Sequence, residues 1–305
     1  MNYEKSFITM SDGKEIMFHS WTGEESPKAI VVISHGMAEH VSRYNDFAAM
    51  LVSRGFAVFG EDHRGHGESA VGRYGYLADK NGFFRVVDDI HEEILNLRQT
   101  YPETKIFLFG HSFGSFISQC YIEKYASSID GCILCGTAGP RKGLIAAASV
   151  LAGIVSALGG KKRPSKFLNA VAFGSYNDRI PDKKTMFDWL SRDEKQVNAY
   201  MGDGECGFLC TGGFFCDMFK GFKYIHKNSH IKAIPESLPV FFIAGTADPV
   251  GSYGQTVQNL VEIYKNNGIR DVELKLYEDA RHELINETNR EEVMSDVVSW
   301  LENHC

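Results

Sequence analysis

Apolar and polar positions alternate along the chain in the order expected of a mostly parallel β-sheet. The first two predicted strands, at 7–10 and 15–18, flank Asp12-Gly13, a dipeptide typical of two-residue hairpins. Continuous apolar runs are typical of parallel strands buried on both faces. The segment 29–34 is such a run, and the segments 56–59, 105–109, 130–135, 238–244 and 272–277 are the further predicted strands.

Helical periodicity separates these runs. In the segment 83–101, for example, Val86, Ile90, Ile94 and Leu97 fall on one helical face. The same pattern predicts helices at 44–54, 83–101, 113–125, 253–266 and 291–302. An opening hairpin followed by repeated strand–helix units predicts an α/β fold, with a mostly parallel sheet covered by helices on both faces.

The alternation stops between residues 140 and 234, where helix formers, glycines and aromatic residues replace clear strands. We interpret this stretch as an insertion over the carboxyl ends of the strands, where doubly wound sheets bind ligands. The predicted organisation is therefore an α/β core formed by 1–139 and 235–305, with a helical cap or lid at 140–234.

Charge and cysteine usage exclude some functions. The chain of 305 residues has 32 basic and 39 acidic residues, a net charge of −7, so it offers no basic field for nucleic acid. The first ten residues lack the features of a secretory signal, and we expect a cytoplasmic protein. Cys206, Cys210 and Cys216 lie close together, but no histidine stands at ligand spacing from them, so we expect neither a metal site nor a cofactor.

The segment Gly110-His-Ser-Phe-Gly114 lies between a predicted buried strand and a predicted helix, which is the context of a nucleophile elbow. A serine at such a turn takes a strained backbone conformation that exposes its Oγ. Glycines two residues away on each side avoid a collision across the sharp bend. The pattern predicts Ser112 as a nucleophile.

A serine nucleophile needs a neutral imidazole held by a carboxylate, and after this type of elbow the acid precedes the histidine along the chain. Asp248 directly follows the strand 238–244, and His282 follows the strand 272–277. The other histidines precede the elbow, point away from it, or lie in the cap or at the chain end. Asp279, the rival acid, is too near His282 in sequence.

An oxyanion hole requires backbone N–H groups aimed at the reacting carbonyl oxygen. One donor should be the residue after the nucleophile, Phe113. The second should come from the loop after the strand 29–34, where Gly36 allows close approach and Met37 offers its N–H.

Five ordered motifs resemble the monoacylglycerol lipase and lysophospholipase-like branch of the α/β-hydrolases, the serine aminopeptidase group. They are 35–40 with Arg43 and Tyr44, 61–69, 110–114, 245–248, and 277–283 with Asn286 and Glu287. The resemblance implies a Ser112–His282–Asp248 triad and an oxyanion hole at Met37 and Phe113. It further implies supporting roles for the loops that contain His35, Gly36, Arg64, His66, Gly110 and Gly114.

The implied activity is cofactor-free hydrolysis of carboxylic esters through an acyl-enzyme, on monoacylglycerols, lysophospholipids or similar lipids with one acyl chain. Small-ester carboxylesterase, thioesterase and peptidase activities use the same machinery and stay open. A non-catalytic ligand receptor on this fold is a further alternative.

The cap offers a guide to the substrate. The run 144–158 is nearly uncharged and is followed by the basic segment 161–163. A helix that is apolar all round is either buried or faces lipid, and we favour a lid that contacts acyl chains or, transiently, a membrane surface. The residues expected to contact substrate are Leu151, Phe208, Phe214 and Phe215. The sequence predicts no oligomeric state.

Overall fold

An eight-stranded β-sheet runs through the molecule in the computed structural model, which describes all 305 residues. The strands are β1 (Asn2–Thr9), β2 (Glu15–Thr22), β3 (Ala29–Ser34), β4 (Ala57–Glu61), β5 (Lys105–His111), β6 (Gly131–Cys135), β7 (Val240–Gly245) and β8 (Val272–Tyr277). Their order is β1-β2-β4-β3-β5-β6-β7-β8. The pairings β1–β2 and β2–β4 are antiparallel and the other five are parallel, which confirms the predicted sheet with its opening hairpin.

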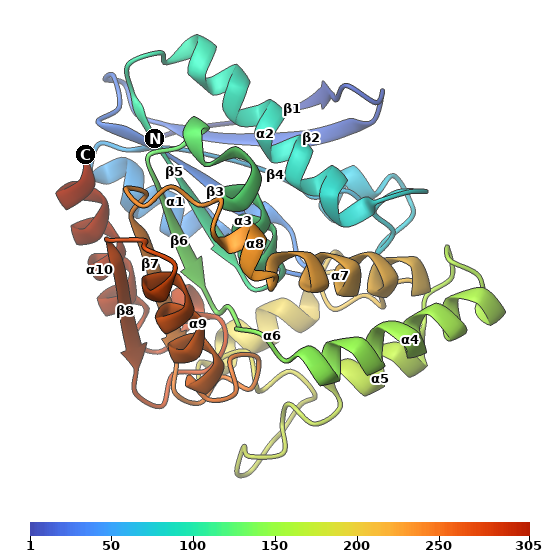
Figure 1. The fold of residues 1–305 in the computed structure, drawn as a ribbon. Coiled ribbons are helices and arrows are strands. Elements are labelled where there is room, and N and C mark those ends of the chain that lie inside the picture. Colours follow the sequence, from blue (N-terminus) through green and yellow to red (C-terminus); the bar gives the residue numbers. More distant parts are fainter.

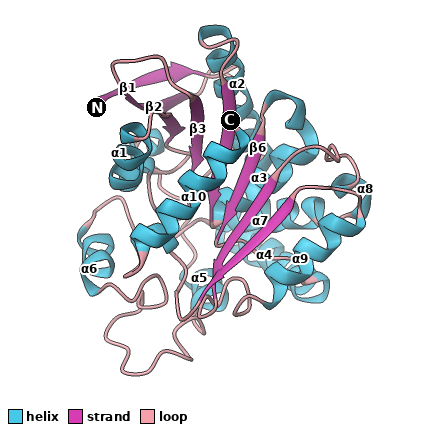
Figure 2. Ribbon diagram, turned by 90° about the vertical axis from the view of Figure 1, so that its left-hand side faces the viewer, coloured by secondary structure: helices cyan, strands magenta, loops and turns pink.

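Helices cover both faces of the sheet (Figures 1 and 2). They are α1 (Asn45–Ser53), α2 (Gly82–Thr100), α3 (Phe113–Tyr125), α9 (Gln255–Asn266) and α10 (Arg290–His304). Short 3₁₀ turns are η1 (Val41–Tyr44), η2 (Gly67–Ala70), η3 (Ala126–Ser128) and η4 (Leu284–Asn286). Helices α1 and α10 pack on one face, and α2, α3 and α9 on the other. Cys132 and Cys135 of β6 accordingly belong to opposite cores.

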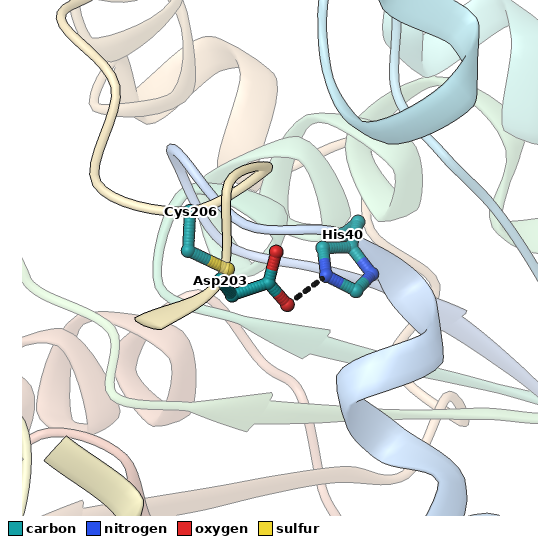
Figure 3. A group of neighbouring side chains, drawn as sticks. All are labelled: His40, Asp203 and Cys206. Atoms are coloured by element: carbon teal, nitrogen blue, oxygen red, sulfur yellow. Dashed lines mark hydrogen bonds and ion pairs between the residues drawn. The ribbon is translucent and has the colours of Figure 1, made fainter. Parts of the chain in front are cut away.

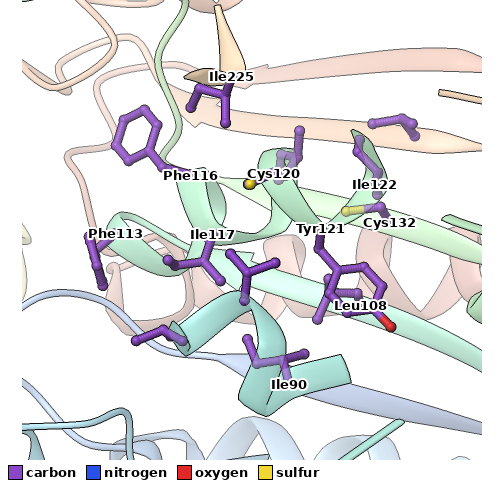
Figure 4. Packing of buried hydrophobic residues seen from close by; sticks show 14 of the residues in the cluster. Ile90, Leu108, Phe113, Phe116, Ile117, Cys120, Tyr121, Ile122, Cys132 and Ile225 are labelled. Atoms are coloured by element: carbon purple, nitrogen blue, oxygen red, sulfur yellow. The ribbon is translucent and has the colours of Figure 1, made fainter. Parts of the chain in front are cut away.

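The central helix α3 holds the elbow against the sheet. Every residue from Phe113 to Glu123 is buried, so α3 is enclosed on all sides rather than amphipathic. Figure 4 shows Phe116, Ile117, Cys120 and Tyr121 among side chains of neighbouring elements. A helix packed so completely gives the turn that precedes it a fixed position.

The segment between β6 and β7 contains helices and loops but no strand, apart from one isolated β-bridge. It contains α4 (Lys142–Gly159), α5 (Lys166–Phe173), α6 (Glu194–Gly202), α7 (Gly212–Ile225) and α8 (Asn228–Ile231), which we call the cap helices. Helix α7 packs on α2 and α3, whereas α4 and α5 lie beyond the lower ends of the strands in Figure 1. Helix α4 is long and apolar enough to cross a membrane, judged by length and composition alone, and it packs along α7.

Candidate active site

The elbow between β5 and α3 has the strained backbone that a nucleophile turn requires. Ser112 has φ +53° and ψ −118°. A Cβ on Gly110 would lie 2.5 Å from the carbonyl oxygen of Gly114, which is the collision across the bend that the sequence suggests. A Cβ on Gly114 would instead lie 1.9 Å from the carbonyl oxygen of Ser34, at the end of β3. The second glycine is therefore needed because the neighbouring strand is so close.

Ser112, His282 and Asp248 lie together in a hydrogen-bonded row. The Oγ of Ser112 is 2.8 Å from Nε2 of His282, and Nδ1 of His282 is 2.9 Å from Oδ2 of Asp248. The other carboxylate oxygen of Asp248 accepts a hydrogen bond from the N–H of Val250 at 2.8 Å, which fixes the carboxylate. Because a carboxylate only accepts, Nδ1 carries the proton and Nε2 is free to take the proton of the serine.

Electrostatics favour the same roles. Burial alone would lower the pKa of His282, but the charge of Asp248 and the hydrogen bond to it outweigh burial, and the pKa is raised above 6.5. His111, whose ring centroid is 4.9 Å from that of His282, is fully buried, and burial together with the nearby His282 lowers its pKa to about 3. His111 is therefore neutral near pH 7 and adds no charge beside the base.

Two backbone donors flank Ser112. Phe113 occupies the first position of α3, where backbone N–H groups have no acceptor within the helix. The loop after β3 approaches from the other side, since a Cβ on Gly36 would lie 3.3 Å from Cβ of Ser112. The N–H of Met37 has no acceptor in the protein, and Met37, Phe113 and Ser112 line the same cavity. These positions suit the oxyanion of an acyl-transfer reaction.

Polar contacts fix the peptide between Gly36 and Met37. Nδ1 of His35 donates to the carbonyl oxygen of Gly36 at 2.7 Å, and its Nε2 accepts the N–H of His63 at 2.9 Å. The N–H of Gly36 donates to Oε1 of Glu39 at 2.5 Å. Because His35 fixes the carbonyl group of Gly36, it also fixes the orientation of the N–H of Met37, which belongs to the same peptide group.

An ion-pair network that the sequence did not predict joins the segment after β3 to the loop that contains His282. Arg43 donates two hydrogen bonds of 2.7 Å to the carboxylate of Glu283, the neighbour of His282, and it also pairs with Glu39. Burial would raise the pKa of Glu283, but Arg43 lowers it to about 2. Arg43 and Glu283 each lie in a recognisable motif, but they are 240 residues apart in the sequence, so their pairing could not be seen there.

The remaining predicted support residues do not line the cavity. Arg64 binds Asp89 and Asp12 at 2.7–2.8 Å and so ties its loop to α2 and to the first hairpin. The ring of His66 stacks on Phe113, with centroids 6.5 Å apart. Neither side chain therefore lies at the wall of the cavity beside Ser112.

A largely apolar cavity of about 680 Å³ opens beside Ser112. Leu151 and Phe208 line it, together with Phe116 of α3 and Met218 of α7. Phe214 and Phe215, which we expected to contact substrate, are not among the lining residues. Both are fully buried, and Phe214 packs against Phe113. Aromatic composition alone could not tell which face of α7 points to the cavity.

Comparison with known proteins adds a family and several relatives. The family model described as serine aminopeptidase, S33 matches residues 25–289. The monoacylglycerol lipase of Mycolicibacterium smegmatis is 28% identical over 309 residues, which cover 99% of this chain and 97% of the relative. The monoglyceride lipase of Mus musculus is 29% identical, with 96% and 89% covered.

The structure also superposes on solved structures of an esterase and a lipase. A highly thermostable carboxyl esterase from Bacillus coagulans, in complex with glycerol, superposes with a TM-score of 0.92 at 28% identity and covers 99% of each chain. A soluble variant of the monoglyceride lipase from Saccharomyces cerevisiae superposes with a TM-score of 0.77 at 19% identity, covering 100% of this chain and 95% of the other. At that identity, the second likeness concerns the fold alone.

Proposed function

Because the chain belongs to the serine aminopeptidase S33 family, we propose that it cleaves monoacylglycerols and similar lipid esters with one acyl chain. It has the α/β-hydrolase fold and is a serine ester hydrolase. The observation that carries the proposal is the Ser112–His282–Asp248 row at the wall of an apolar cavity of about 680 Å³. That volume lies within the usual range of ligand pockets.

In the proposed reaction, Oγ of Ser112 attacks the ester carbonyl carbon while Nε2 of His282 takes the serine proton. The N–H groups of Met37 and Phe113 hold the negative oxygen, and Asp248 stabilises the imidazolium. His282 then protonates the leaving alcohol, which departs and leaves an acyl-serine. Water, deprotonated by His282, releases the fatty acid and restores the serine.

The lining of the cavity supports an acyl chain as the bound group. Side chains of the core, such as Phe116, and of the cap, such as Leu151 and Met218, are apolar and surround the space next to Ser112. Removing such surfaces from water contributes about 25 cal/mol per Å², so each added methylene should strengthen binding until the cavity is filled.

A matched pair of leucine variants tests the substrate class. Leu151 of α4 lines the cavity, whereas Leu95 of α2 is 44% exposed and lies away from the cap helices. We expect Leu151→Asp to lower kcat/KM on long-chain monoacylglycerols far more than on a short soluble p-nitrophenyl ester, while Leu95→Asp leaves both rates close to wild type. Equal losses on both esters in Leu151→Asp, or a wild type that prefers the short ester, would contradict the lipid assignment and favour a small-ester carboxylesterase.

We further propose that the cap contacts membranes transiently to collect its substrate. Helix α4 exposes Val150, Ile154 and Leu158, and it is followed by the exposed basic residues 161–163. An apolar helix face beside basic residues is typical of a helix that lies in the membrane interface. Leu144 is exposed and also lines the cavity, so this apolar surface continues into the site.

Vesicle sedimentation tests this contact. We expect the wild type to sediment with vesicles that contain an anionic phospholipid, and Ile154→Glu to stay in the supernatant while it keeps its rate on the short soluble ester. The control Leu95→Glu changes an exposed leucine of α2, away from the cap helices, and should bind as the wild type does. Binding that is equal in all three proteins would contradict the contact.

A further inference from the structure

Three side chains with metal-binding atoms meet outside the candidate active site. His40 lies in the loop after β3, while Asp203 and Cys206 lie in the loop that follows α6 (Figure 3). One ring nitrogen of His40, a carboxylate oxygen of Asp203 and Sγ of Cys206 all lie within 4.8 Å of one another. A tetrahedral metal with ligands at about 2.0–2.3 Å holds its ligand atoms about 3.3–3.8 Å apart. Small side-chain rotations can reach this spacing from the observed separations, which are 2.9 Å between His40 and Asp203 and at most 4.8 Å in the group.

Neighbouring groups hold His40 and Asp203 in place and offer His40 a second hydrogen-bond partner that a metal ligand needs. Nε2 of His40 faces Asp203 at 2.9 Å, and its Nδ1 lies 2.7 Å from Oγ of Ser42. Because a carboxylate only accepts, Nε2 donates to Asp203 in this structure, and Nδ1 accepts the hydroxyl proton of Ser42. A metal ion would take the place of the proton on Nε2, and that proton would move to Nδ1 and be donated to the hydroxyl of Ser42. The second oxygen of Asp203 accepts the N–H of Glu205 at 2.8 Å, which fixes the carboxylate.

The two loops are also held together without a metal. The N–H of Gly207 and the hydroxyl of Tyr200 both donate to the carbonyl oxygen of Ala38 at 2.9 Å. Cys206 is 9% exposed and His40 is 7% exposed, so the cluster is enclosed but within reach of solvent through the partly exposed Asp203. A site with this preformed backbone needs little further ordering to bind an ion.

We propose that His40, Asp203 and Cys206 form a binding site for Zn²⁺ or a similar transition metal, with water as the fourth ligand. Imidazole, carboxylate and thiolate together match Zn²⁺, whereas Mg²⁺ and Ca²⁺ prefer oxygen ligands alone. On binding, the S–H bond of Cys206 breaks, an S–Zn bond forms, and the proton passes to solvent without any change of oxidation state. One carboxylate and one thiolate then balance the two charges of the ion.

Such an ion would join the cap to the loop that supplies Met37. Gly207 and Phe208, next to Cys206, line the cavity, and so does Ala38, two residues before His40. Metal binding would therefore brace one wall of the cavity. The proposal revises the expectation of no metal site. That expectation rested on the absence of a histidine at ligand spacing from the cysteines, and it could not take account of His40, 166 residues before Cys206 in the sequence. It does not depend on the catalytic assignment.

Cobalt spectroscopy tests the site directly. Co²⁺ replaces Zn²⁺ in such sites, and a Co²⁺–thiolate bond gives a charge-transfer band in the near ultraviolet. After treatment with a chelator and its removal, we expect the wild type to bind one equivalent of Co²⁺ with this band, and added Zn²⁺ to abolish it. Cys206→Ser and His40→Ala should lose the band and bind Zn²⁺ more than about 100-fold more weakly. Ser42→Ala should lower the affinity for Zn²⁺ by about 10- to 100-fold, because His40 then loses the hydrogen bond at Nδ1.

Two control variants separate this site from adventitious binding. Cys216→Ser removes a free thiol outside the cluster, and His304→Ala disrupts a second, more exposed group with Asp271 and Glu273. Both should keep the band, with unfolding temperatures showing that every variant is folded. No saturable thiolate band in the wild type, or a band that persists in Cys206→Ser, would overturn the proposal.

Discussion

Replacing Glu283 by glutamine removes a charge from the centre of the buried network beside His282. Glutamine keeps the size and one accepting oxygen, but it turns a second hydrogen-bond acceptor into a donor that faces the guanidinium of Arg43. Arg43 would keep only Glu39 as an ion-pair partner. Removing one member of a buried ion pair generally costs about 3–5 kcal/mol.

The pKa of Glu283 gives an independent magnitude. It is lowered from 4.5 to about 2, because the charge of Arg43 outweighs the effect of burial. With about 1.4 kcal/mol for each pKa unit, this difference corresponds to about 3 kcal/mol of folding free energy. The folded pKa lies below the unfolded one, so this stabilisation is complete above pH 4.5 and is lost as the pH falls toward about 2.

Thermal unfolding of the wild type and Glu283→Gln over a pH series is the assay. Near neutral pH we expect the variant to melt roughly 6–12 °C below the wild type. The gap should narrow as the pH falls below 4.5, since Glu283 of the wild type then becomes protonated. Glu236→Gln, which removes an exposed partner of Arg270, should cost less than about 1 kcal/mol. A small gap at neutral pH, or one that does not change with pH, would refute the reasoning.

Two further predictions concern the site itself. Asp248→Asn should lower kcat by about 10⁴-fold. The acid limb of kcat/KM, which follows the raised pKa of His282 in the wild type, should move to lower pH because burial then dominates that pKa. Profiles of rate against pH measure both effects, and an unmoved acid limb would contradict the role of Asp248. Gly114→Ala places a Cβ 1.9 Å from the carbonyl oxygen of Ser34 and should yield little folded protein on expression, while Gly143→Ala, which meets nothing within 4 Å, should express and melt like the wild type.

The sheet was predictable where the strand pattern is clear, as in the fully buried apolar run 29–34 and in the alternation of apolar and charged residues at the start of 272–277. The predicted strands 29–34 and 272–277 and the predicted helix 113–125 have the observed bounds. By contrast, β1 begins at Asn2, five residues before its predicted start. It is an exposed edge strand, so the alternation that marks a half-buried strand is missing there.

Backbone motifs were readable from sequence because they rest on local geometry, and long-range pairs were not. The elbow needs glycine at fixed offsets from Ser112, and such offsets are visible in a string of letters. The pairing of Arg43 with Glu283 and the meeting of His40 with Cys206 depend on how distant loops fold together. Neither pair has a spacing that distinguishes it from other charged or polar residues.

Covalent labelling of Ser112 tests the central claim most directly. A fluorophosphonate probe reacts with serines that are activated by a neighbouring base, and intact mass counts the adducts on each chain. We predict one adduct on the wild type and none on Ser112→Ala at the same unfolding temperature. A folded wild type that takes up no probe, or a Ser112→Ala protein that is labelled equally well, would contradict the assignment of Ser112 as the nucleophile.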